Sequence, residues 1–172
     1  GKLLEKKKQG IGTTRLHYRI PYPHATYLMM LGIGKYDVLE KQSASGVPMR
    51  LLYYPEFPEQ AEPTYRYSVE MFDFFEKEIG YPYPWGSYAQ VPVQDFMYGA
   101  MENTTATIFG DFFLVDNHGY HDRNYVAVNA HELAHQWFGD LVTARSLQHH
   151  WLQESFATFY NMMYEQEVFG KD

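Results

Sequence analysis

The chain has 172 residues, which is long enough for one folded domain or for part of a larger protein. Of these residues 45% are hydrophobic and 18% aromatic, so the chain can bury far more apolar surface than a disordered chain. The formal net charge is −7, and the sequence has no dense Lys/Arg stripe. This disfavours a nucleic-acid or anionic-membrane partner, whereas a cationic small substrate remains compatible. The sequence contains no Cys, so thiol catalysis and disulfides are excluded and any metal must be held by His, Asp or Glu.

No apolar run approaches the roughly 20 residues of a membrane-spanning helix, and the N-terminus has no apolar core typical of a secretory signal. These features leave the localisation open. The first part of the chain predicts a β-rich segment, residues 1–58, because β-favouring runs alternate with Gly- and Ser-rich turns. The predicted strands are residues 14–20, 25–31, 35–39 and 47–54.

Pro55–Pro63 carries three prolines and no periodic apolar pattern, which is typical of a boundary. After it, apolar residues recur at steps of three and four from 63 to 79, and Gly80 follows, which predicts an amphipathic helix with a glycine stop. Residues 87–93 and 104–109 predict strands, with Pro92 indicating an edge position or a strand end. Two further helices are predicted, from about Asp122 to Phe138 and from about His150 to Phe169. The pattern indicates an α+β fold with a boundary near residue 58.

The chemistry is concentrated in the first of those late helices, which contains His131-Glu132-Leu-Ala-His135. At 3.6 residues per turn the two imidazoles project from one face and can reach one metal ion, and Glu132 lies close enough to address a metal-bound water. A catalytic zinc needs a third protein ligand and an open position. Glu154, separated from His135 by eighteen residues, is the candidate. The alternative is that two histidines at this spacing are unrelated and partly buried.

The surroundings of this motif favour the metal site. A second motif, Gly99-Ala-Met-Glu-Asn103, lies upstream, and Trp151–Phe159 contains Glu154. With His131–Thr143, these motifs resemble the zinc aminopeptidases of the alanyl, or membrane-alanine, aminopeptidase family, gluzincins that also include the leukotriene hydrolase. The resemblance extends loosely over the whole chain. Departures are small: the family usually has Asn and Gly where this chain has Gln153 and Ser155, and commonly Trp-Gly where Thr104-Thr105 stand.

The resemblance implies that His131, His135 and Glu154 bind one zinc ion per chain and that Glu132 is the general base. It also implies that residues 1–58 are the end of an N-terminal β domain, and that residues 59–172 are the first part of a thermolysin-like catalytic domain with a small sheet and two zinc-bearing helices. The family's oxyanion-binding Tyr and a second amine-binding acid find no match in this sequence. We therefore expect a fragment that has the remaining domains of a parent enzyme as partners and is weakly active or inactive by itself.

The upstream motif implies recognition of the substrate. Glu102 would bind the free α-amino group, and the backbone of Gly99 and Ala100 could pair with the substrate as an added strand. Tyr98 occupies a position that borders the pocket for the first substrate residue in the family, although it could equally be a core aromatic. Thr158 is a possible hydrogen-bond partner of a ligating His.

The leading hypothesis is a zinc aminopeptidase that hydrolyses the N-terminal residue from peptides with a free N-terminus. Two alternatives stay open: a zinc-stabilised peptide-binding domain without turnover, and epoxide hydrolysis as in the leukotriene hydrolase. Glu132 argues against the first, because a structural site needs no base. His149 and His150 are assigned to the surface or to the helix start, on the interpretation that neither has ligand spacing to another His or carboxylate.

Overall fold

A mixed five-stranded sheet organises the protein, whose computed structural model describes residues 1–121 and 124–170. In spatial order the strands are β3 (Asp37–Gln42), β4 (Pro48–Tyr53), β5 (Tyr88–Val93), β7 (Ala106–Gly110) and β6 (Ala100–Met101). The outer pairs β3–β4 and β6–β7 are antiparallel, whereas β4, β5 and β7 are parallel. Parallel neighbours need a crossover connection, and the one between β4 and β5 contains α1 (Ala61–Tyr65) and α2 (Ser68–Ile79).

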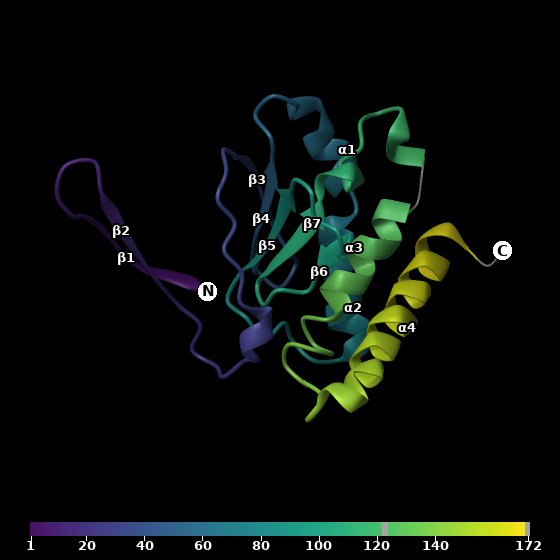
Figure 1. The fold of residues 1–172 in the computed structure, drawn as a ribbon. Coiled ribbons are helices and arrows are strands. Elements are labelled where there is room, and N and C mark those ends of the chain that lie inside the picture. The colour runs from purple at the N-terminus through teal and green to yellow at the C-terminus, as the bar shows by residue number, and fades with distance from the viewer. Residues whose placement is uncertain (122–123, 171–172) are drawn as a thin grey trace.

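Three helices, α2, α3 (Asn124–Ala134) and α4 (His150–Phe169), lie on one side of this sheet (Figure 1). The layer between them is largely aromatic. Phe72 packs on Tyr83 with ring centroids 4.8 Å apart, and Phe75 packs on Tyr164 of α4 at 6.1 Å. Such rings bury large apolar areas in defined geometries. The core therefore fixes the positions of α3 and α4, which carry the predicted metal ligands.

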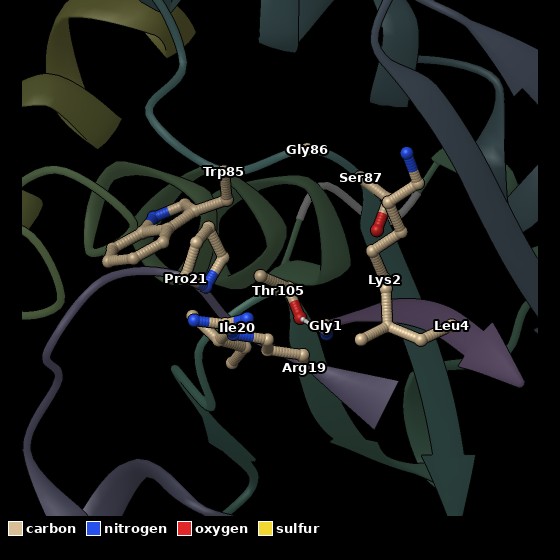
Figure 2. Close-up of a pocket in the computed structure, with 10 residues that line it drawn as sticks. All are labelled: Gly1, Lys2, Leu4, Arg19, Ile20, Pro21, Trp85, Gly86, Ser87 and Thr105. Atoms are coloured by element: carbon tan, nitrogen blue, oxygen red, sulfur yellow. Dashed lines mark hydrogen bonds between the residues drawn. The ribbon is translucent and has the colours of Figure 1, made fainter. Parts of the chain in front are cut away.

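An exposed hairpin of β1 (Lys2–Lys8) and β2 (Thr14–Arg19) projects away from the helices (Figure 1). A pocket of about 230 Å³ lies where this hairpin approaches the sheet (Figure 2), between residues such as Arg19, Ile20 and Trp85. The described residues also form five short 3₁₀ turns: η1 (Thr26–Leu28), η2 (Pro58–Gln60), η3 (Asp111–Phe113), η4 (Gly119–His121) and η5 (Leu147–His149). Among the described residues, no helix combines the length and apolarity needed to cross a membrane.

Most predicted elements are confirmed, including the strands at β2, β4, β5 and β7, with β3 beginning two residues later than expected. The helix at 150–169 is confirmed, as is the stop at Gly80, whose φ of 69° is left-handed. The predicted strand at 25–31 is wrong. Thr26–Leu28 forms a 3₁₀ turn instead. Side-chain hydrogen bonds replace strand pairing here: Asn103 donates to the Leu28 carbonyl at 3.2 Å, and Gln153 donates to the Tyr27 hydroxyl at 2.8 Å.

Two helix boundaries also differ from expectation. The helix predicted over 63–79 is interrupted between α1 and α2, and α3 ends at Ala134 instead of Phe138. Asp122, the predicted cap of that helix, lies outside the described residues. The prediction that Pro92 lies at an edge or a strand end is confirmed in its second form. Pro92 is the last residue but one of β5, and β4 pairs only with Tyr88–Gln90, so the missing amide of Pro92 faces no β4 partner.

The α+β fold class is confirmed, with the zinc-ligand candidates between two helices. Because β4 pairs with β5, the two strands β3 and β4 of the β-rich segment are part of the same sheet as the strands after residue 58. The division into domains at residue 58 stays a prediction.

Candidate metal centre

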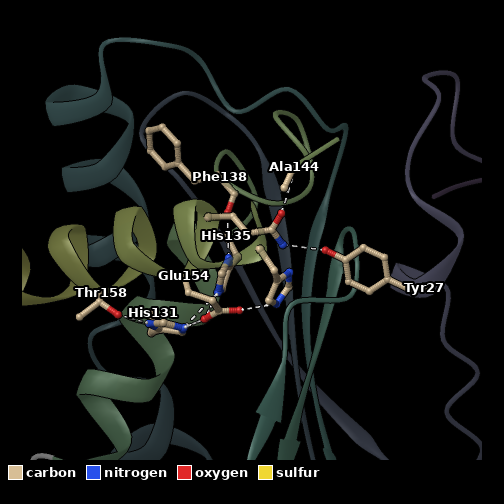
Figure 3. Close-up of polar contacts among 9 residues, drawn as sticks. Tyr27, His131, His135, Phe138, Ala144, Glu154 and Thr158 are labelled. Carbon is tan, nitrogen blue, oxygen red and sulfur yellow. Dashed lines mark hydrogen bonds and ion pairs between the residues drawn. The ribbon is translucent and has the colours of Figure 1, made fainter. Parts of the chain in front are cut away.

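Three side chains from two helices converge on one point, as Figure 3 shows. His131 Nε2 lies 3.0 Å from His135 Nε2 and 3.2 Å from Glu154 Oε2, and the last two atoms are 3.4 Å apart. His131 lies in the last turn of α3 and His135 follows directly after the helix end at Ala134. Glu154 lies in the first turns of α4, which packs against α3. A tetrahedral zinc with bonds of about 2.0–2.1 Å would separate such donor atoms by roughly 3.4 Å. The spacing of the three donors therefore fits zinc.

The early end of α3 orients His135. The His135 Nδ1 donates to the carbonyl oxygen of Phe138 at 2.8 Å, and this bond requires the proton on Nδ1, which leaves the Nε2 lone pair for a metal. The chain reverses directly afterwards at Gly139, whose φ is 141°. A Cβ at this glycine would lie 3.0 Å from His135 Nδ1, so Gly139 allows the turn to close against the imidazole.

Charge within this group is balanced by protons when no metal is bound. Burial by itself lowers the pKa of His135, but the hydrogen bond with Glu154 and the charges of Glu102 and Glu132 raise it to about 9. The hydrogen bonds with His131 and His135 hold the pKa of Glu154 well below its usual range. A divalent cation can replace these protons and satisfy the same carboxylate, so its binding must release protons.

Two further carboxylates lie near the three ligands and are almost fully buried. Glu132 is 7% exposed and Glu102 is 5% exposed, and one oxygen of each has no hydrogen-bond partner in the described part of the chain. Burial, reinforced by Glu102 and Glu154 and opposed by His135, raises the pKa of Glu132 to about 8. A buried carboxyl group whose pKa lies near neutral pH is suited to proton transfer.

Gln136 connects the end of α3 to the loop between β6 and β7, residues 102–105, which we call the Glu102 loop. Its side chain is fully buried, accepts from the backbone N–H of Thr105 at 2.9 Å, and donates to the Glu102 carbonyl at 3.3 Å. It also accepts from the Tyr83 hydroxyl and donates to the Asn103 carbonyl. One amide therefore sets the distance between the zinc-ligand helix and the loop that carries Glu102. No local pattern in the sequence predicts this role.

His150 lies in the site, contrary to the expectation that it lacks ligand spacing. Its Nε2 is 2.9 Å from Glu154 Oε1, the oxygen that does not face His131 and His135. The signal that the sequence reasoning overlooked is the four-residue step from His150 to Glu154, which places both on one helix face.

Gln153 and Tyr27 lie beside His150. Gln153 accepts from the Ala144 backbone and donates to the Tyr27 hydroxyl at 2.8 Å. Tyr27 packs edge-on against His150, with ring centroids 6.4 Å apart. The η1 turn therefore contacts the start of α4.

The remaining predicted site residues lie at the edge of the sheet. Ala100 begins β6, the edge strand next to β7, and the carbonyl of Gly99 accepts from Gly110 N–H at 2.6 Å. Tyr98 is 83% exposed, so it lies outside the core that the described residues form. Thr158 Oγ1 lies 3.5 Å from His131 Nδ1, the limit of a weak hydrogen bond.

Comparison with known proteins agrees with this geometry. The family model described as the peptidase family M1 domain matches residues 64–172. The chain is 30% identical over 154 residues to a glutamyl aminopeptidase of Sus scrofa, covering 87% of this chain and 16% of that protein. It is 37% identical over 145 residues to aminopeptidase N of Streptomyces lividans, covering 78% of this chain and 17% of that protein. It is 33% identical over 144 residues to a puromycin-sensitive aminopeptidase of Caenorhabditis elegans, covering 81% and 15%.

Proposed function

This chain belongs to the peptidase family M1, and we propose that it carries the zinc centre of an aminopeptidase that removes the N-terminal residue from peptides. The observation that carries the proposal is the convergence of two imidazole nitrogens and one carboxylate oxygen within 3.0–3.4 Å, beside a buried glutamate. Because the chain spans 15–17% of the length of the three aminopeptidases compared above, the reaction is proposed for the protein of which these residues are a part.

His131, His135 and Glu154 would hold one zinc ion per chain. Bound there, zinc would polarise the scissile carbonyl and lower the pKa of a water molecule towards 7. The Phe138 carbonyl keeps the His135 proton on Nδ1, so the ring presents the nitrogen that a metal needs. His150 holds the second oxygen of Glu154, which favours binding through one oxygen.

Glu132 is proposed as the general base. It accepts a proton from the attacking water and can deliver that proton to the leaving amine. Its burial makes this chemistry efficient, because the raised pKa lets the carboxyl group both take and release a proton near neutral pH.

Glu102 is proposed to bind the free α-amino group of the substrate, since its unpartnered buried oxygen lacks a cationic partner. The edge position of β6 supports pairing of the substrate backbone with Gly99 and Ala100 as an added strand. Tyr98, exposed next to this edge, is proposed to border the pocket for the first residue.

The test separates the base from the amine-binding residue. Glu132→Gln should lower kcat on an aminoacyl anilide by roughly 10²–10⁴-fold with zinc content unchanged, whereas Glu102→Ala should weaken discrimination between free and N-acetylated substrates. Glu59→Gln is the control, because Glu59 is exposed in η2. Cleavage of acetylated peptides as fast as free ones, or turnover of a lipid epoxide in place of anilides, would overturn the proposal.

A further inference from the structure

A second group of potential metal ligands lies directly beside the first and shares Glu154 with it. Ligand atoms of Glu102, His150 and Glu154 all lie within 4.8 Å of one another. His150 Nε2 is 2.9 Å from Glu154 Oε1, whereas His131 and His135 approach Glu154 Oε2. The two oxygens of one carboxylate therefore face two different sets of ligands.

Glu102 supplies an independent indication of a cation-binding position. Glu102 is only 5% exposed, and its Oε1 has no hydrogen-bond partner among the residues that the structure describes. A buried carboxylate oxygen without a hydrogen-bond donor is costly. The unpartnered Glu102 oxygen is therefore available to a cation.

We propose that Glu102, His150 and Glu154 form a second Zn²⁺ site, bridged to the first by the carboxylate of Glu154. The inference rests on the proposed function of the first site. One imidazole nitrogen and two carboxylate oxygens are a donor set that zinc accepts. In two-metal sites the ions are about 3.5–4 Å apart, a separation that one bridging carboxylate spans. Donor atoms up to 4.8 Å apart need only a small side-chain movement to reach the roughly 3.4 Å of a tetrahedral ion.

The second ion would occupy the position proposed for the α-amino group of the substrate, because both use the Glu102 carboxylate. Zinc in excess of one equivalent should therefore compete with substrate and raise KM without lowering kcat. The second site should also be weaker than the first, since the Glu154 charge is already shared and His150 is only half-buried. These consequences distinguish the site from a structural ion, which would leave KM unchanged.

The experiment is calorimetric titration of the metal-free protein with zinc at constant pH. Wild type should bind two ions in two separate steps. His150→Leu and Glu102→Gln should lose the second step and keep the first, with its Kd changed less than about tenfold, equivalent to 1.4 kcal/mol. His149→Leu is the matched control, because this neighbouring histidine is exposed and outside both ligand groups, and it should keep both steps.

A competition arm tests the shared position. An amino acid amide with a free amino group should weaken the second step, whereas its N-acetylated form should not. One step in wild type, two steps in His150→Leu, or loss of the second step in His149→Leu would each overturn the inference. If the first step remains and depends on His135, the proposed function survives that failure. If no step depends on His135, the proposed function fails as well.

Discussion

Replacing Gln136 by Met should destabilise the protein strongly while leaving the zinc ligands in place. Methionine fills a similar volume but makes none of the four hydrogen bonds of the fully buried amide. Two of the partners keep a second bond: the Tyr83 hydroxyl donates to Ser87 and the Asn103 carbonyl accepts from Ala106. The Thr105 N–H and the Glu102 carbonyl lose the partner that Gln136 supplies.

Leaving a buried polar group unsatisfied costs about 1–3 kcal/mol. Two such groups give an expected loss of about 2–6 kcal/mol in the free energy of unfolding, against a total of about 5–15 kcal/mol for a typical domain. Urea unfolding of the zinc-free protein measures this loss, with Gln148→Met at an exposed position as the control, expected within about 0.5 kcal/mol of wild type. Because Gln136 holds the Glu102 loop and not the ligands, the first zinc should still bind. A loss below about 1 kcal/mol would refute the reasoning.

Two further predictions concern the metal and the protons that it replaces. His135→Ala should lose zinc on dialysis whereas Glu132→Gln should retain it, and unchanged zinc content in His135→Ala by elemental analysis would remove the ligand assignment. In the zinc-free protein the pKa of Glu132 is raised to about 8 and the pKa values of His135 and Asp140 to about 9. At a pH between a group's pKa in the unfolded chain and its raised pKa in the folded protein, the folded state holds a proton that the unfolded state has lost. The melting temperature without zinc should therefore fall from about pH 6 to about pH 9, and the increase on adding zinc should grow over the same interval because zinc binds the deprotonated ligands. A zinc-free melting temperature that stays flat or rises would contradict the buried, protonated site.

The sequence was sufficient for the parts of this protein that depend on local periodicity. Two histidines four residues apart share a face of any α-helix, so the pairing of His131 with His135 required no tertiary information. The helix at 150–169 and the glycine stop at Gly80 also follow from local propensity and are confirmed. The motif around Glu102 indicated a role in recognition, which stays a prediction.

Only the tertiary structure decided how these local elements meet. The packing of α4 on α3 brings the Glu154 carboxylate to the two imidazoles, and the aromatic core that sets this packing joins residues far apart in the chain. The same holds for residues 25–31, which looked like a strand but contact the Asn103 and Gln153 side chains through hydrogen bonds that span 75 and 126 residues. Local propensity cannot report such contacts, because their free energy comes from partners that only the folded chain brings within reach.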